Sequence, residues 1–155
     1  MDMKCPKCCA KVDLNMDQCD KCGFDMKRIF QLIKDGDKFF NQEKYPDAIE
    51  CYEKVIKLDK KNAIAWRGKA NVLLKQGENS EGVTYCVKCQ LSPVLSEAFY
   101  EEAVKCYEKA TNINPEFKDA WYKKGVAFER LGKSLDAKKC FEIAKELGYV
   151  PNPLY

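Results

Sequence analysis

The chain has 155 residues, of which 46% are hydrophobic and 33% charged, and its formal net charge is +3. Charges of both signs are interspersed, so we expect no strong field for nucleic acid or an anionic membrane. Ten cysteines and no histidine exclude Cys/His catalytic pairs and leave cysteine as the only soft metal ligand. With no apolar run long enough for a membrane span and no signal peptide at the start, we expect a cytoplasmic protein with reduced thiols.

The first 28 residues carry two C-x2-C pairs, Cys5/Cys8 and Cys19/Cys22, separated by ten residues. Four thiolates around one ion form a closed, structural site with no open position for chemistry. A segment this short cannot bury a sufficient core, so metal binding would supply most of its folding free energy. The pattern resembles the short zinc-ribbon family, and the resemblance implies one structural Zn2+ held by Cys5, Cys8, Cys19 and Cys22.

The same segment contains one thiol too many for this site. Cys9 stands where the zinc-ribbon family usually carries Gly, and C-x2-C geometry favours Cys5 and Cys8 as the ligands over a vicinal pair. We therefore expect Cys9 to be a non-ligand. The alternatives are free or oxidised thiols in a disordered tail, or a redox dithiol, which the absence of a strand–helix context disfavours.

Three segments farther along share a small residue, an aromatic residue four positions later, and an apolar or small residue three further on: Ala48/Tyr52/Val55, Ala103/Tyr107/Ala110 and Ala137/Phe141/Ala144. A second element precedes each of them, at 32–40, 66–74 and 121–132. Small residues let paired helices approach, and the aromatic rings fill the space between them. The pattern predicts three helix–turn–helix units.

These units resemble the tetratricopeptide repeat family, and the resemblance implies an all-α helical-repeat solenoid of about three repeats behind the zinc ribbon. We place the ribbon at residues 1–28 and the helical repeat domain at residues 29–155. The repeats are expected at about 29–62, 63–117 and 118–151.

The second repeat is 21 residues longer than the others, and the addition is expected at about 78–97. It contains a third thiol pair, Cys86 and Cys89. In one interpretation Gly82, Cys86 and Cys89 take the positions of a further helix, which Pro93 ends, and the thiols are small buried hydrophobes. In the other, the stretch is an excursion whose thiols bind a shared metal or carry out redox chemistry.

The remaining cysteines have a regular placement. Cys51, Cys106 and Cys140 each come just before the aromatic residue of a second helix, which favours packing between helices over metal ligation. No acid/base pair, phosphate-binding loop or open metal site stands out in the sequence, so we expect no enzyme.

Stacked helix pairs leave a concave face lined by the first helix of each pair, and such solenoids hold their partners there. Register with the family implies a lining of apolar, aromatic and charged side chains, some of which are expected to pack between repeats instead. These residues are Ile33, Asp37, Phe40 and Asn41 in the first repeat, Arg67, Asn71, Leu74 and Lys75 in the second, and Tyr122, Val126, Glu129 and Arg130 in the third.

Some family members hold the C-terminal carboxylates of a peptide with Lys and Asn on the first of these helices, Asn on the second, and Lys and Arg on the third. In this chain only Asn71 fits that set; Ile33, Asp37, Tyr122 and Val126 occupy the other places. We therefore predict no carboxylate clamp. A peptide or helix held by apolar contacts with a few hydrogen bonds is the better expectation.

The predicted function is that of a non-enzymatic adaptor, which binds a partner protein or peptide through the concave face and uses the zinc ribbon as a second contact module. The alternative is a nucleic-acid-associated factor, in which the ribbon contacts DNA or RNA and the repeats recruit other proteins; the balanced charges of the ribbon do not favour it. The apolar residues at 149–155 lack a polar capping helix, which leaves open a homodimer through the C-terminal end.

Overall fold

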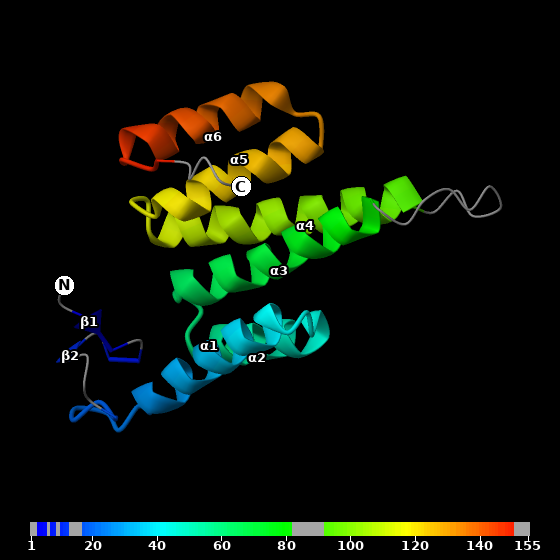
Figure 1. Ribbon diagram of the computed structural model, residues 1–155. Helices are drawn as coiled ribbons and strands as arrows, with labels where there is room; N and C mark the ends of the chain where they lie inside the picture. Colours follow the sequence, from blue (N-terminus) through cyan, green and yellow to red (C-terminus); the bar gives the residue numbers. More distant parts are fainter. Residues whose placement is uncertain (1–2, 6, 9, 13–16, 82–91, 151–155) are drawn as a thin grey trace.

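The computed structural model describes residues 3–5, 7–8, 10–12, 17–81 and 92–150 of the chain (Figure 1). An antiparallel pair of short strands, β1 (Met3–Lys4) and β2 (Lys11–Val12), precedes the helices. The helices are α1 (Met26–Asn41), α2 (Tyr45–Leu58), α3 (Ala63–Glu81), α4 (Ser92–Ile113), α5 (Lys118–Arg130) and α6 (Ser134–Glu146). They form three stacked antiparallel pairs, so the predicted all-α solenoid is confirmed.

Glycines on the first helices make room for aromatic rings on the second helices. A Cβ atom built on Gly36 would lie 2.9 Å from Cε1 of Tyr52, and one on Gly68 only 2.4 Å from the same atom. A Cβ on Gly125 would lie 2.6 Å from Cε1 of Phe141. These separations are far below a van der Waals contact, so the helices can approach only because the positions lack a side chain. Tyr52 thereby links α2 to both α1 and α3.

The first helices of the three pairs form the inner layer of the stack. α1 contacts α3 and α3 contacts α5, whereas α2 and α4 have no comparable contact in the part of the chain that the structure describes. The largest core cluster lies where α3, α4 and α5 meet, around the buried Tyr107 and Ala103. The stack therefore curves, with α1, α3 and α5 inside and α2 and α4 spread apart on the outer side.

The added residues of the second repeat lengthen both of its helices, to 19 residues in α3 and 22 in α4. Gly77 on α3 meets α4, since a Cβ there would lie 2.4 Å from Cε1 of Tyr100. The glycine–aromatic packing of the stack therefore also occurs on both sides of the added residues, between α3 and α4. The interpretation in which Pro93 ends a helix is wrong, because Pro93 lies in the first turn of α4, where its missing N–H costs nothing. Cys86 and Cys89 lie outside the described residues.

α1 begins inside the segment that the sequence assigns to the ribbon. Asp25 is its N-cap, and the side chain accepts a hydrogen bond of 2.9 Å from the backbone N–H of Arg28. The N-terminal segment thus runs directly into the first helix of the stack. Within the described ranges, no helix combines the length and the apolar character that a membrane crossing needs.

Candidate metal centre and inner helix face

The two C-x2-C pairs fold into equivalent turns. The backbone N–H of Cys5 donates to the carbonyl of Ala10 at 2.8 Å, and the N–H of Cys19 donates to the carbonyl of Phe24 at 2.9 Å. Within the second turn the N–H of Gly23 donates to the carbonyl of Cys19 at 2.7 Å. Gly23 has a φ of 67°, a left-handed conformation that glycine adopts at little cost. Both turns direct their sulfur atoms to one point.

The four predicted thiols lie together. The sulfur atoms of Cys5 and Cys22 are 3.5 Å apart, and those of Cys8 and Cys19 are 3.6 Å apart; all four lie within 4.8 Å of one another. A tetrahedral Zn2+ with bonds of about 2.3 Å would separate its sulfur ligands by about 3.8 Å. The cluster could therefore hold a metal ion. Cys9 lies outside the described residues.

The protonation of these thiols depends on burial and on one another. Burial alone would raise the pKa of the Cys5 thiol, but the backbone N–H groups of Cys8 and Lys7 donate toward it and hold that pKa at about 6. Burial, together with the neighbouring thiols, raises the pKa of Cys22 to about 12. One thiolate forms readily, and further ionisation is opposed by the negative charge already present. A bound cation removes that opposition.

The N-terminal segment is attached to the stack through the start of α1. The carbonyl of Asp17 accepts from the N–H groups of Met26 and Lys27 at 2.9 and 3.0 Å. Phe24 packs against the cysteine cluster on one side and against the apolar cluster that contains Ile29 on the other. Because Ile29 packs with side chains of α2 and α3, the cysteine cluster and the first repeat are joined through the apolar contacts of Phe24.

Two of the predicted residues on the inner face are tied to buried tyrosines. The hydroxyl of Tyr52 donates to Oδ1 of Asp37 at 2.6 Å, and the hydroxyl of Tyr107 donates to Oδ1 of Asn71 at 2.7 Å. Burial raises the pKa of Tyr52, and the Asp37 carboxylate raises it further. These bonds hold the Asp37 and Asn71 side chains in place, so the polar groups of the face are preorganised.

Arg67, the cation at the centre of this face, is already paired. Its guanidinium lies 3.2 Å from a carboxylate oxygen of Asp119 on α5, and it also lies over the ring of Phe117, 5.0 Å from the centroid. Both side chains of the ion pair are less than one-third exposed. The pair therefore links α3 to α5 and neutralises the positive charge that a carboxylate ligand would need.

The opposite end of the face has further contacts of its own. Nζ of Lys75 lies 3.0 Å from a carboxylate oxygen of Glu78, and the guanidinium of Arg130 lies 4.0 Å from the other oxygen. At the end where Arg67 pairs with Asp119, Tyr122 stacks on Tyr149 with ring centroids 4.4 Å apart. The face thus carries charges of both signs near its two ends, and the Tyr122–Tyr149 stack lies near the Arg67–Asp119 pair.

One of the twelve predicted face residues is not available to a partner. Leu74 is 8% exposed and lies in the core cluster with side chains of α4 and α5. The others keep some exposed surface: Ile33, Asp37, Phe40, Asn41, Arg67, Asn71, Lys75, Tyr122, Val126, Glu129 and Arg130. Neither Asp119 nor Glu78 is among the residues predicted from the sequence. The sequence does place Asp119 two residues before Trp121, in the first turn of the helix that faces Arg67, and this position is the signal that could have identified it.

Comparison with protein families finds repeats along this chain. Residues 36–77 and 100–132 match the model described as "TPR repeat", and residues 118–147 match the one described as "Tetratricopeptide repeat". Together these segments make up more than half of the chain. They begin beyond the cysteine cluster, to which they therefore do not extend.

A curated relative of similar sequence is "DnaJ homolog subfamily C member 3" of Gallus gallus. It is 30% identical over an alignment of 119 residues, and the match covers 66% of this chain and 24% of that protein. The chain spans about a quarter or less of the length of the first curated relatives that it matches. The likeness thus leaves most of each relative unmatched.

Two solved structures share the fold at 28% sequence identity. One is the second repeat domain of Spaghetti (RPAP3) bound to the HSP90 peptide SRMEEVD, with a TM-score of 0.61, covering 78% of this chain and 93% of that chain. The other is the second repeat domain of human RPAP3 with the HSP70 peptide SGPTIEEVD, with a TM-score of 0.63, covering 79% and 84%. Both neighbours hold a peptide.

Proposed function

Because the chain belongs to the tetratricopeptide repeat family, we propose that it is a non-enzymatic adaptor that binds a partner protein or peptide. The binding surface is the inner face of α1, α3 and α5. The observation that carries this proposal is the preorganised set of polar side chains there, in which Asp37 and Asn71 are fixed by tyrosine hydroxyls. The peptides held by two structural neighbours support a peptide as the class of ligand.

The ligand differs in charge from those peptides, which end in acidic residues. Asp37 and Asp119 would repel a carboxylate on this face, and Arg67 is already paired with Asp119 at 3.2 Å. A neutral or weakly basic segment suits this face better. Such a segment makes apolar contacts with Phe40, Tyr122 and other exposed rings and methyl groups, and it forms hydrogen bonds to side-chain oxygens.

The N-terminal segment serves as a second contact module that folds on one structural Zn2+. The four sulfur atoms within 4.8 Å of one another support this, since thiolate is the ligand that zinc prefers in closed structural sites. The described cysteines are free thiols, which fits a reducing, cytoplasmic compartment. No substrate pocket with an acid/base pair enters the proposal, and the adaptor acts by binding alone.

Affinity capture from native lysate, followed by mass spectrometry, tests the adaptor function. The bait is compared with the variant Asn41→Arg/Lys75→Glu/Glu129→Lys, which alters three exposed positions on the inner face. A matched control, Lys139→Glu/Glu142→Lys, alters two exposed positions on α6. We expect a partner protein that the wild type and the control retain and the face variant loses.

Two results would contradict the adaptor proposal. One is capture that the face variant leaves unchanged. The other is binding to DNA or RNA that falls steeply with salt, which is the signature of the nucleic-acid-associated alternative.

The charge of the ligand is tested with the HSP90 peptide itself. Titration of the chain with SRMEEVD, the peptide bound in the Spaghetti (RPAP3) structure, should give no saturable binding that depends on the inner face, so any affinity should be the same for the wild type and for Asn41→Arg/Lys75→Glu/Glu129→Lys. Tight binding of SRMEEVD that this face variant loses would show that the inner face accepts C-terminal carboxylates despite Asp37 and Asp119.

A further inference from the structure

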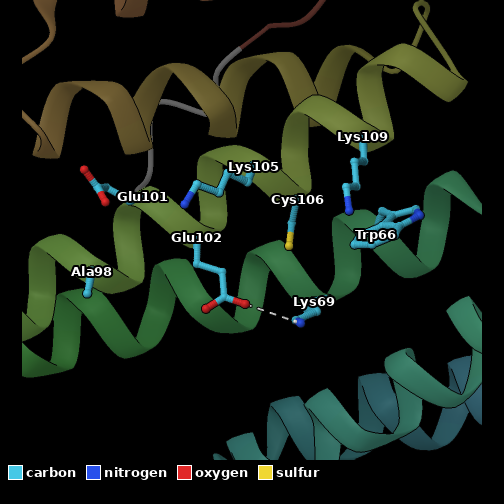
Figure 2. Close-up of a pocket in the computed structure, with 8 residues that line it drawn as sticks. All are labelled: Trp66, Lys69, Ala98, Glu101, Glu102, Lys105, Cys106 and Lys109. Carbon is cyan, nitrogen blue, oxygen red and sulfur yellow. Dashed lines mark ion pairs between the residues drawn. The ribbon is translucent and has the colours of Figure 1, made fainter.

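A trough lies on the outer side of the stack, between α2 and α4, with α3 as its floor. Two hollows of about 480 and 530 Å³ adjoin there and share Trp66 of α3 and Lys109 of α4 in their linings. Figure 2 shows the first hollow, with the Lys109 side chain reaching from α4 toward Trp66. Nζ of Lys109 lies 4.2 Å from the centroid of that ring, and Nε1 of Trp66 donates to the carbonyl of Lys60 at 3.0 Å.

This trough is separate from the inner face. Successive residues of a helix turn by about 100°, so Trp66 and Lys69 lie on the side of α3 opposite to Asn71 and Lys75. α2 and α4 stand apart because each packs against α3 without a comparable contact between them in the described residues. The stack therefore presents two independent surfaces, one inside the curve and one outside.

The second hollow combines an apolar floor with positive charge. Trp66, Ile56 and Ile113 contribute its apolar lining, and Lys57, Lys60 and Lys109 line it as well. Among the described residues, no carboxylate oxygen lies within 4.0 Å of these three ammonium groups. None of the three therefore forms an ion pair in that part of the chain. The pKa of Glu50 is lowered mainly by the hydrogen bond that Lys54 donates to it, and the charge of Lys57 lowers it further.

The first hollow differs in this respect. Nζ of Lys69 lies 2.9 Å from a carboxylate oxygen of Glu53 on α2 and 3.4 Å from one of Glu102 on α4, and the latter pair is drawn in Figure 2. These bridges cross the trough and neutralise its charge at that point. Lys105 also lines the first hollow, but Glu101 and Glu102 line it too, whereas the second hollow has three lysines and no acidic residue in its lining. Net positive charge is thus concentrated at the Trp66–Ile113 end.

From this arrangement we propose that the trough is a second docking site, which takes an acidic segment of a partner protein with an aliphatic or aromatic side chain as its anchor. The anchor packs on Trp66 and between Ile56 and Ile113, and Asp or Glu residues on either side pair with Lys57, Lys60 and Lys109. Three lysines around an apolar floor fit a short acidic peptide better than nucleic acid, which needs a longer basic track. The site is independent of what the inner face binds.

Trp66 can report on its own occupancy. The chain has two tryptophans, so Trp121→Phe leaves Trp66 as the only one. The probe is a heptapeptide with blocked ends, Leu and Phe at its centre and Asp or Glu elsewhere; its twin carries Lys in place of the acids. We expect the acidic peptide to change the Trp66 emission saturably with one site per chain, and the basic twin to leave it unchanged.

Variants test the role of the lysines. Lys57→Glu/Lys60→Glu should weaken binding of the acidic peptide about tenfold or more, since two attractions become repulsions. The control Lys138→Glu/Lys139→Glu makes the same change in net charge at exposed positions on α6 and should leave the affinity within about twofold. Thermal denaturation of each variant checks that it is folded, and Lys109→Gln provides a milder change at the same site.

Several outcomes would overturn the proposal. They are the absence of a saturable signal, equal responses to the two peptides, equal losses in the trough variant and its control, and complete displacement of the peptide by a single-stranded oligonucleotide. Sedimentation is the final check. If the chain alone forms a dimer that Lys57→Glu/Lys60→Glu dissociates, the trough is an interface between copies and not a site for another protein.

Discussion

The cysteine cluster and the helical stack behind it are held together by different means. In the cluster, four sulfur atoms converge within 4.8 Å, and the apolar side chains around them are those of Met26, Ala10, Phe24 and Phe30. In the stack, buried tyrosines fill spaces left by glycines on neighbouring helices. A fold built around thiols is stabilised by a metal ion that it must bind, whereas a fold built around interlocking side chains is stabilised by its own packing.

The largest expected effect is the loss of one ligand of the cluster. Cys19→Ser should abolish metal binding, with bound zinc falling from one ion per chain to nearly none, because a closed site needs all four thiolates. The effect on the N-terminal segment should be large, since a structural zinc contributes on the order of 10 kcal/mol to the folding of small domains. Metal analysis of the purified chain gives the stoichiometry. Helical circular dichroism should stay near the wild-type value, since the stack does not use the metal.

A second cysteine serves as the control for this experiment. Cys140 is buried in α6 and lies far along the chain from the cluster, and Cys140→Ser should keep the full metal content. Equal loss of zinc in both variants would mean that the metal is not held by the cluster alone.

The stack should respond most to removal of a ring at its centre. Tyr52 is 2% exposed, and Tyr52→Ala should lower the free energy of unfolding by about 3–5 kcal/mol, because it leaves a cavity between α1, α2 and α3. Urea denaturation measures this. Tyr52→Phe keeps the ring and loses only the hydrogen bond to Asp37, so it should cost about 1 kcal/mol. Equal costs for the two variants would show that the ring does not fill the space.

The complementary change adds an atom where the ring already lies. Gly68→Ala would place a Cβ 2.4 Å from Tyr52, and the forced shift should cost about 1–3 kcal/mol. In an unconstrained helix the same substitution would instead stabilise by about 0.5–1 kcal/mol. The sign of the change in urea midpoint therefore decides whether close approach is required here.

The smallest expected effect is a gain in the turn between α1 and α2. Glu43 has a φ of 59°, and in the corresponding turn between α5 and α6 Gly132 has a φ of 70°. In both turns the next residue donates its N–H to a carbonyl five positions earlier, at 3.0 and 2.9 Å. Glu43→Gly should raise stability by about 0.5 kcal/mol, since it relieves left-handed strain. A decrease in the thermal midpoint would mean that the Glu43 side chain stabilises the turn in some other way.

Much of this architecture could be predicted from the sequence because it rests on local spacing. The recurring small and aromatic residues predict three helix pairs, which the structure confirms. The doubled C-x2-C spacing predicts four converging thiols, and the structure brings Cys5, Cys8, Cys19 and Cys22 together. In each case a short motif with a fixed geometry carries the information.

Spacing along the chain does not predict contacts between residues that are far apart in the sequence. Proline can end one helix or begin the next, so Pro93 alone could not show that it lies in the first turn of α4. The pairing of Arg67 with Asp119 joins residues 52 positions apart and depends on how two repeats stack. The trough at Trp66 likewise requires three helices to be placed in space before its charges can be counted.

Hydrogen exchange with and without a strong zinc chelator tests the central difference between the two regions most directly. The account predicts that chelation speeds amide exchange in residues 17–24 and in the first turns of α1, which share the Phe24 contact, and leaves α2 to α6 unchanged. Simultaneous loss of protection along the whole chain would contradict it, because the stack would then depend on the metal. Unchanged protection of residues 17–24 in a zinc-free chain would contradict it equally, because the cluster would then be folded without the metal.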